Sequence, residues 1–163
     1  MDYKSVITMK KSRYFWVVGI ILLDQIVKLV VRSSMFVGQS IPVIEDIFHI
    51  TYVQNRGAAF NMMDGKSLLL ITVPAIAIAV AIWYMEKHLE EHWTLLVSLV
   101  LIIAGGIGNL IDRCLMGFVT DMFDFRIWPV FNVADIAVCV GAGILILYTF
   151  AFYEEKEIEK NEV

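Results

Sequence analysis

The sequence predicts an all-α membrane protein, a four-helix transmembrane bundle with a small β element on its outer side. The 163 residues are 59% hydrophobic, and the mean hydropathy is +0.73, far above the norm for soluble proteins. Four apolar runs are long enough to cross a hydrocarbon core, which takes about 20 helical residues. None of them alternates as a membrane β-barrel strand does. The length corresponds to a single domain, residues 1–163.

The four apolar runs should all be helices, because lipid offers no hydrogen-bond partner to an extended or irregular backbone. Aromatic side chains lie near the ends of these runs, as interfacial anchors do. The predicted helices cover residues 14–31, 68–85, 93–111 and 133–153.

The connection over residues 33–67 is too long for a simple turn. Phe48, Ile50 and Tyr52 alternate with intervening residues in a period of two that is rich in β-branched and aromatic side chains. We expect short strands here. The loop is also unusually apolar, so we expect it to rest on the membrane or on an apolar ligand.

Basic residues set the expected orientation. Lys4, Lys10, Lys11 and Arg13 precede the first helix, which places the N-terminus in the cytoplasm, and an even number of crossings returns the C-terminus there. Residues 33–67 and the connection before the fourth helix are then outside. The first run lacks a small-residue cleavage pattern and contains charged residues, so we interpret it as a retained anchor.

Several functions are disfavoured by composition and spacing. The net charge of -4 argues against a nucleic-acid partner. Cys114 and Cys139 fit neither a disulfide framework nor a metal-ligand spacing, and the histidines form no clustered motif. There is no glycine-rich phosphate loop. We therefore expect no metal and no organic cofactor.

Residues 104–135 hold several aspartates and asparagines between two apolar runs. Ionisable groups beside membrane spans are costly and are usually functional. Asp121 and Asp135 are predicted at the outer ends of consecutive antiparallel helices, where they can meet. Two carboxyl groups this close share a proton, so one can act as a base on a water while the other polarises an amide carbonyl. The candidate donors for orientation or for the oxyanion are Asn55, Arg56, Asn109 and Asn132.

Purely structural interpretations exist for these aspartates. Asn132 is a natural N-cap for the fourth helix and Asp135 falls at its third position, a capping-box arrangement. Asp121 could be a solvated loop residue. Changes of aspartate to asparagine would then be tolerated, as in a non-catalytic scaffold protein.

The supporting polar residues also have two interpretations. Asp24, Lys28 and Arg32 form one stripe on the first helix, either a structural ion pair or a support for the active-site loops, and in both cases facing the bundle. Asn109 and Asp112 share a helix face, and Arg113 serves the helix dipole, clamps Asp112 or binds a substrate carbonyl.

Five segments taken together resemble, in order and topology, the motifs of bacterial lipoprotein signal peptidase (signal peptidase II). Each motif is weak alone, and the match spans about residues 14–153. The segments are Asp24-Gln25-Ile26-Val27-Lys28, Asn55-Arg56-Gly57-Ala58-Ala59-Phe60, Gly108-Asn109-Leu110-Ile111-Asp112-Arg113, Gly117-Phe118-Val119-Thr120-Asp121 and Phe131-Asn132-Val133-Ala134-Asp135.

The resemblance implies a multi-pass aspartic endopeptidase of the bacterial cell membrane, with both termini cytoplasmic and the active site toward the outer face. It would remove the signal peptide from diacylglyceryl-modified prolipoproteins just before the lipidated cysteine. Membrane lipids and globomycin-type inhibitors are implied as further partners, and the outer loop resembles the family's β-cradle. The catalytic dyad falls on Asp121 and Asp135, and the substrate-binding or supporting positions are Asp24, Lys28, Asn55, Arg56, Gly57, Asn109, Asp112, Arg113, Asn132 and Ala134.

The chain departs from the family at the first catalytic position. The family often has Asp-Phe there, whereas Asp121 is followed by Met122, and Asp124-Phe125 lies three residues later. The spacing from Gly117 selects Asp121. An alternative from another class is a small proton-coupled transporter whose carboxylates relay protons, but the acidic residues gather toward one face instead of mid-membrane depth.

Overall fold

The computed structural model describes residues 3–57, 67–88 and 92–161, which form four long helices and a three-stranded sheet. Each helix contains a stretch long and apolar enough to cross a membrane, which confirms the predicted fold class. The helices extend beyond their predicted ends, because the prediction followed only the apolar runs. They are α1 (Tyr3–Ser34), α2 (Ser67–Lys87), α3 (Trp93–Met116) and α4 (Val133–Asn161).

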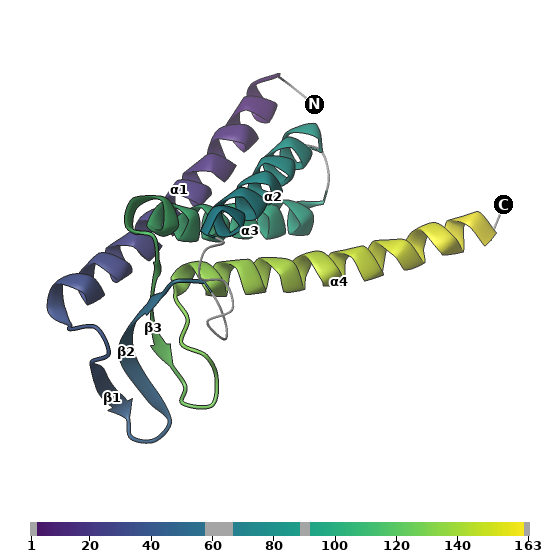
Figure 1. Ribbon diagram of the computed structural model, residues 1–163. Helices are drawn as coiled ribbons and strands as arrows, with labels where there is room; N and C mark the ends of the chain where they lie inside the picture. Colours follow the sequence, from purple (N-terminus) through teal and green to yellow (C-terminus); the bar gives the residue numbers. More distant parts are fainter. Residues whose placement is uncertain (1–2, 58–66, 89–91, 162–163) are drawn as a thin grey trace.

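The sheet lies at one end of the bundle, beside the end of α1 and the start of α4, and both chain ends point away from it (Figure 1). Its strands are antiparallel in the order β1-β2-β3. Two of them lie in the loop where strands were expected. The strands are β1 (Ser40–Ile44), β2 (Phe48–Asn55) and β3 (Val119–Asp124).

Strand β3 corrects one prediction, because Asp121 was expected at the end of a helix. Helix α3 ends at Gly117, which adopts a left-handed φ of 75° and donates its N–H to the carbonyl of Arg113. This turn sends the chain out of the bundle. The next residues, Val119, Thr120 and Met122, are buried as β3 pairs with β2. The apolar pattern over residues 119–124 is too short to predict a strand by itself, because the burial of these residues depends on pairing with β2.

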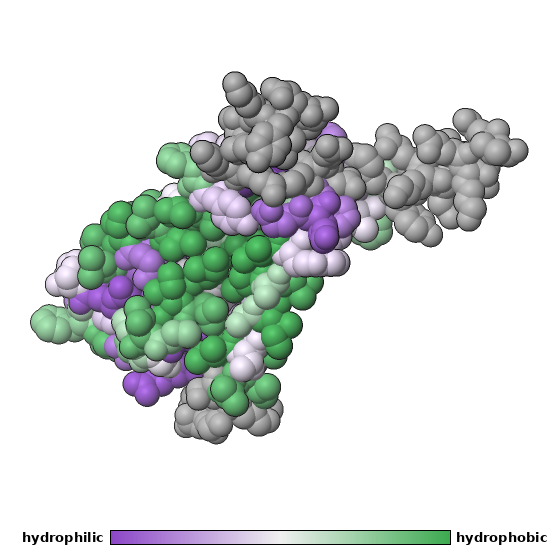
Figure 2. Space-filling model, turned by 90° about the horizontal axis from the view of Figure 1, so that it is seen from above, coloured by the Kyte–Doolittle hydropathy of each residue, from purple (hydrophilic) through white to green (hydrophobic). Residues whose placement is uncertain are grey.

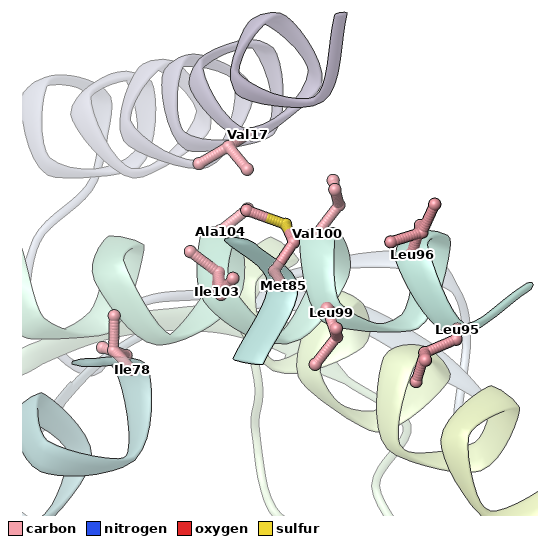
Figure 3. Close-up of a cluster of buried hydrophobic side chains, with 9 residues drawn as sticks. All are labelled: Val17, Ile78, Met85, Leu95, Leu96, Leu99, Val100, Ile103 and Ala104. Atoms are coloured by element: carbon pink, nitrogen blue, oxygen red, sulfur yellow. The ribbon is translucent and has the colours of Figure 1, made fainter. Parts of the chain in front are cut away.

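Helix α3 is the centre of the bundle. In its apolar span 56% of the residues are buried, against 22%, 11% and 17% for the spans of α1, α2 and α4. Figure 3 shows side chains of α1 and α2, such as Val17 and Met85, gathered around Ile103 and Ala104 of α3. The face of the molecule seen in Figure 2 is broadly hydrophobic, and large apolar side chains are exposed on each of the four helices, such as Leu22, Ile76, Trp93 and Leu147.

Glycines allow α3 and α4 to approach closely. A Cβ atom at Gly105 would overlap the carbonyl oxygen of Ala134 and lie 2.8 Å from Val138 Cγ2. A Cβ atom at Gly141 would lie 2.8 Å from the carbonyl oxygen of Ser98. Since lipid provides little hydrophobic drive between helices, such close packing is a main source of their association.

Replacing Gly105 with alanine should separate α3 from α4. We expect Gly105→Ala to lower the unfolding temperature in detergent, at a cost of roughly 1–3 kcal/mol for overpacking. Gly143→Ala on α4 is the matched control, because nothing lies within 4 Å of that position and alanine favours helix. Equal unfolding temperatures for the two variants would contradict the close-packing account.

Candidate active site

The N-terminus of α4 is closed by a reciprocal pair between Asn132 and Asp135. The Asn132 side-chain oxygen accepts the backbone N–H of Asp135 at 2.9 Å, and the Asp135 carboxylate accepts the backbone N–H of Asn132 at 3.2 Å. This is the predicted capping box. It occupies only one carboxylate oxygen of Asp135, so the cap does not exclude a second role.

Asp121 lies on β3 and is only 1% exposed. It pairs across the sheet with Val53, which places it diagonally opposite Asn55 on the same face. The Asn55 amide donates to Asp121 Oδ2 at 3.0 Å, and the Asn132 amide donates to Asp121 Oδ1 at 2.6 Å. The strand therefore brings Asp121 to the N-terminus of α4.

Two asparagines join the aspartates into one network. Asn132 Nδ2, besides its bond to Asp121, donates to Asn109 Oδ1 at 3.1 Å. Asn109 Nδ2 in turn donates to Asp135 Oδ1 at 2.7 Å. The two aspartates are thus linked through asparagines, with Asp121 on a strand and Asp135 on a helix, and not at two helix ends as expected.

The loop between β3 and α4 returns to the sheet at Phe131. Its carbonyl accepts the N–H groups of Met122 and Phe123 at 3.0 and 2.8 Å, and its own N–H donates to the Phe123 carbonyl at 3.1 Å. The rings of Phe123 and Phe131 are 5.7 Å apart. Because these contacts fix Phe131 beside β3, the next residue, Asn132, lies next to Asp121.

The polar stripe of α1 faces the bundle, as predicted. Lys28 Nζ is fully buried and lies 2.9 Å from Asp24 Oδ2 and 3.4 Å from Asp112 Oδ2. It also donates to Asn109 Oδ1 at 3.0 Å. Arg32 lies 3.6 Å from Asp112 Oδ1. We call the set of Asp24, Lys28, Arg32 and Asp112 the buried ion cluster.

The carboxylates of this cluster hold the backbone just before each aspartate of the pair. Asp24 accepts the N–H of Ala134 at 2.9 Å, and Asp112 accepts the N–H of Thr120 at 2.9 Å. Thr120 was not singled out from the sequence. The sequence marks Thr120 only by its position directly before Asp121, because it is the backbone N–H of Thr120, and not its side chain, that binds Asp112.

Arg113 does not clamp Asp112, whose partners lie on α1 and β3. It lines an apolar cavity of about 720 Å³ between α2, α3, α4 and the loop 128–131. Asn109, Arg113 and Asp135 are the polar side chains of its lining. This volume suits a sizeable ligand. Among the described residues, no group of three or more His, Cys, Asp or Glu side chains could hold a metal ion.

A family model described as Signal peptidase (SPase) II, Peptidase_A8, matches residues 16–151. The chain belongs to the signal peptidase II family. It is therefore an aspartic peptidase that processes lipoproteins in a membrane. The lipoprotein signal peptidase of Halothermothrix orenii is 51% identical over 135 residues, 83% of this chain and 92% of that protein. The one from Clostridioides difficile is 41% identical over 142 residues, 86% and 95% of the two chains.

Solved structures agree with signal peptidase II membership. A bacterial membrane enzyme determined at 2.3 Å is 28% identical and superposes with a TM-score of 0.83, over 90% of this chain and 92% of that one. A second, determined at 1.9 Å, is 29% identical with a TM-score of 0.79. These findings favour the peptidase over the transporter and the scaffold.

Arg56 and Gly57 lie at the end of β2, apart from the buried ion cluster. Gly57 has a φ of 96°, and its N–H donates to the side chain of Asn55 at 2.9 Å. Arg56 and Arg113 line a small cavity of about 30 Å³ next to Asn55. Gly57 is thus tied to a residue that binds Asp121.

Burial raises the pKa of Asp121 from 3.8 to about 6. The amides of Asn55 and Asn132 oppose this rise, and the nearby Asp135 carboxylate adds to it. Asp121 thus has a strongly perturbed proton affinity, which is typical of catalytic acids and bases.

Asp124 behaves differently, although it lies on the same strand. It accepts the Thr51 hydroxyl at 2.8 Å and both the backbone and guanidinium of Arg126 at 2.8 and 3.0 Å. Burial acts to raise the pKa of Asp124, but these hydrogen bonds outweigh it and the net shift is downward. Its pairing residue on β2 is His49, at the end away from Asn55. The geometry favours Asp121 over Asp124 as the partner of Asp135.

Because its pKa is raised, ionisation of Asp121 destabilises the folded protein as the pH rises. The folded protein binds this proton more tightly than the unfolded chain, so stability falls as pH rises from about 3.8 through about 6. A shift of about two pKa units corresponds to about 3 kcal/mol. We expect the unfolding temperature of Asp121→Asn, relative to wild type, to be higher at pH 7.5 than at pH 4.5.

Asp124→Asn is the control and should show the opposite sign. Its lowered pKa adds stability only when the carboxylate is ionised, so the variant should lose stability at pH 7.5 and approach wild type in acid. Thermal unfolding in detergent measures both differences. A difference between wild type and Asp121→Asn that is independent of pH would rule out the burial argument.

Proposed function

We propose that Asp121 and Asp135 are the catalytic dyad of this signal peptidase II, and that it removes the signal peptide from diacylglyceryl-modified prolipoproteins just before the lipidated cysteine. The observation that carries the proposal is the pair of aspartates joined by Asn109 and Asn132, of which Asp135 lines the apolar cavity of about 720 Å³. Hydrolysis of a lipid-linked peptide by an aspartic peptidase needs a carboxyl pair, and an apolar groove beside it suits the lipid.

In the proposed reaction the dyad holds one proton and a water molecule. The ionised carboxylate takes a proton from the water, whose oxygen bonds to the amide carbon before the lipidated cysteine. The protonated carboxyl group gives its proton to the carbonyl oxygen, which yields a gem-diol. The carboxyl group that took the proton from water then gives it to the leaving nitrogen as the C–N bond breaks, and a gem-diol hydroxyl returns a proton to the other carboxylate, so the dyad again holds one proton. Arg113, which lines the same cavity, is placed to orient a substrate carbonyl.

The apolar cavity accounts for the lipid part of the substrate. Side chains of α2 and α4 line it, and most residues in the apolar spans of these two helices are not buried inside the protein. Acyl chains can therefore remain in the bilayer while the peptide reaches Asp135. Globomycin-type inhibitors should occupy the same cavity.

The proposed topology places both termini in the cytoplasm and the sheet outside. Its support is the basic N-terminal segment, the even number of candidate spans and the position of the sheet away from both chain ends (Figure 1). The β1–β2 hairpin exposes apolar side chains suited to lie on the membrane surface. These are Ile41, Val43, Ile44 and Ile47.

Cleavage of a lipidated prolipoprotein in detergent tests the dyad. We expect Asp121→Asn and Asp135→Asn to lose at least about 10³-fold in kcat, because each removes a group that exchanges a proton in the transition state. Asp124→Asn, the same change on the same strand, should stay active. If Asp124→Asn were dead and Asp121→Asn active, the first aspartate would be reassigned.

Gly57 offers a test of the loop beside Asp121. Its φ of 96° disfavours a side chain, and an added Cβ would overlap Leu70. We expect Gly57→Ala to slow cleavage severalfold by moving Asn55. Gly38→Ala is the control, because Gly38 has a similar φ of 84° but nothing within 4 Å. Equal slowing in both variants would show that backbone strain alone is responsible.

A further inference from the structure

We propose that a groove between α1 and α3 binds a phospholipid with an anionic headgroup. It lies toward the end of the bundle away from the sheet (Figure 1), and none of its lining residues lines the cavity beside Asp135. The inference therefore goes beyond the proposed function and does not depend on the dyad. The groove has a volume of about 230 Å³ and is lined by Arg13, Trp16 and Ile20 of α1 and by Leu96, Val97, Val100 and Leu101 of α3.

In the proposed topology the groove opens at the cytoplasmic boundary of the membrane and runs inward. The candidate span of α1 begins at Ser12, directly before Arg13, and α3 begins at Trp93, three residues before Leu96. Ile20 lies seven residues deeper than Arg13, roughly 10 Å along the helix axis. Every lining residue other than Arg13 is aromatic or aliphatic. A charge at the boundary followed by an apolar trough matches a phospholipid headgroup followed by its acyl chain.

Arg13 supplies the charge at the mouth of the groove. Only 7% of this residue is exposed, so its guanidinium does not extend into water as that of a snorkelling side chain does. Glu86 of α2 interacts electrostatically with Arg13 and accepts the Tyr14 hydroxyl at 3.0 Å. A guanidinium has five N–H donors, and a carboxylate bound in bidentate fashion takes two of them. Arg13 therefore has enough donors to bind Glu86 and a phosphate group together.

The charge pattern of the surrounding sequence selects an anionic lipid as the occupant. Residues 3–23 contain no Asp or Glu, and their basic residues are Lys4, Lys10, Lys11 and Arg13. Basic pockets between membrane helices on the cytoplasmic side bind anionic headgroups. A zwitterionic lipid would bring its own ammonium group to this basic segment, and the diacylglyceryl group of the proposed substrate carries no phosphate. An anionic phospholipid of the cytoplasmic leaflet is thus the occupant whose charge fits.

Quenching of Trp16 by brominated acyl chains tests the groove, because bromine quenches the fluorescence of a tryptophan that it contacts. Trp16 becomes the single tryptophan of the full-length chain after Trp83→Phe, Trp93→Phe and Trp128→Phe, at three exposed positions. We expect brominated phosphatidylglycerol in detergent micelles to half-quench Trp16 at a mole fraction about fivefold lower than brominated phosphatidylcholine with the same chains. Equal quenching by the two lipids overturns the proposal.

Arg13→Gln removes the charge from the groove, and the two lipids should then quench Trp16 equally. Lys87→Gln is the matched control, because Lys87 is an exposed basic residue in the last turn of α2, at the same end of the bundle, and does not line the groove. It should keep the preference for phosphatidylglycerol. Since the two lipids are compared within each variant, a change in stability does not imitate the result. A preference that survives Arg13→Gln, or that Lys87→Gln abolishes as well, overturns the site.

A second variant covers the case in which Arg13→Gln does not fold. Val97 lines the groove and is 38% exposed, so Val97→Phe should fill the groove without changing any charge. We expect the half-quenching fraction of phosphatidylglycerol to rise to that of phosphatidylcholine. An unchanged preference in the folded variant overturns the groove as the binding place. A dimer in detergent that Val97→Phe dissociates would identify a second copy of the chain as the occupant and would also overturn the proposal.

Discussion

The rest of the structure depends on one buried ammonium group, that of Lys28, and on its two ion pairs with the carboxylates of Asp24 and Asp112. A charge inside a membrane bundle is tolerated only with close partners, and here each partner performs a second task by accepting a backbone N–H from β3 or α4. Removing one member would leave an uncompensated charge and also release a segment that carries an aspartate. Stability and site geometry therefore rest on the same contacts.

The asparagines explain how two acidic groups can be held together in a buried site. An amide offers donors to the carboxylates and an acceptor for a cation or a backbone N–H, so Asn109 and Asn132 satisfy Asp121 and Asp135 without adding net charge. A lysine in their place would neutralise the pair, and an aliphatic residue would leave the carboxylates without partners. In the proposed mechanism the amides leave both acids available for proton exchange.

Local signals in the sequence predicted the parts of the fold that depend on local chemistry. The four spans follow from hydropathy, and the cap formed by Asn132 and Asp135 follows from a spacing of three residues. Strand β3 could not be predicted this way, because its burial depends on pairing with β2 across the whole of α2 and α3. The same holds for Thr120, whose contribution is a backbone N–H, and for Arg113, which faces the cavity although it directly follows Asp112.

The capping box of α4 gives the proposed chemistry a fixed depth. Asp135 is the third residue of a helix whose candidate span begins at Val133, so in the proposed topology its carboxylate is about one helical turn, roughly 5 Å, from the membrane boundary. The depth of the substrate in the bilayer then determines which peptide bond can reach the two carboxyl groups. A substrate whose lipid anchor sits in the same leaflet presents a peptide bond at a height set by its own acyl chains, and only bonds close to that anchor come level with the two carboxyl groups.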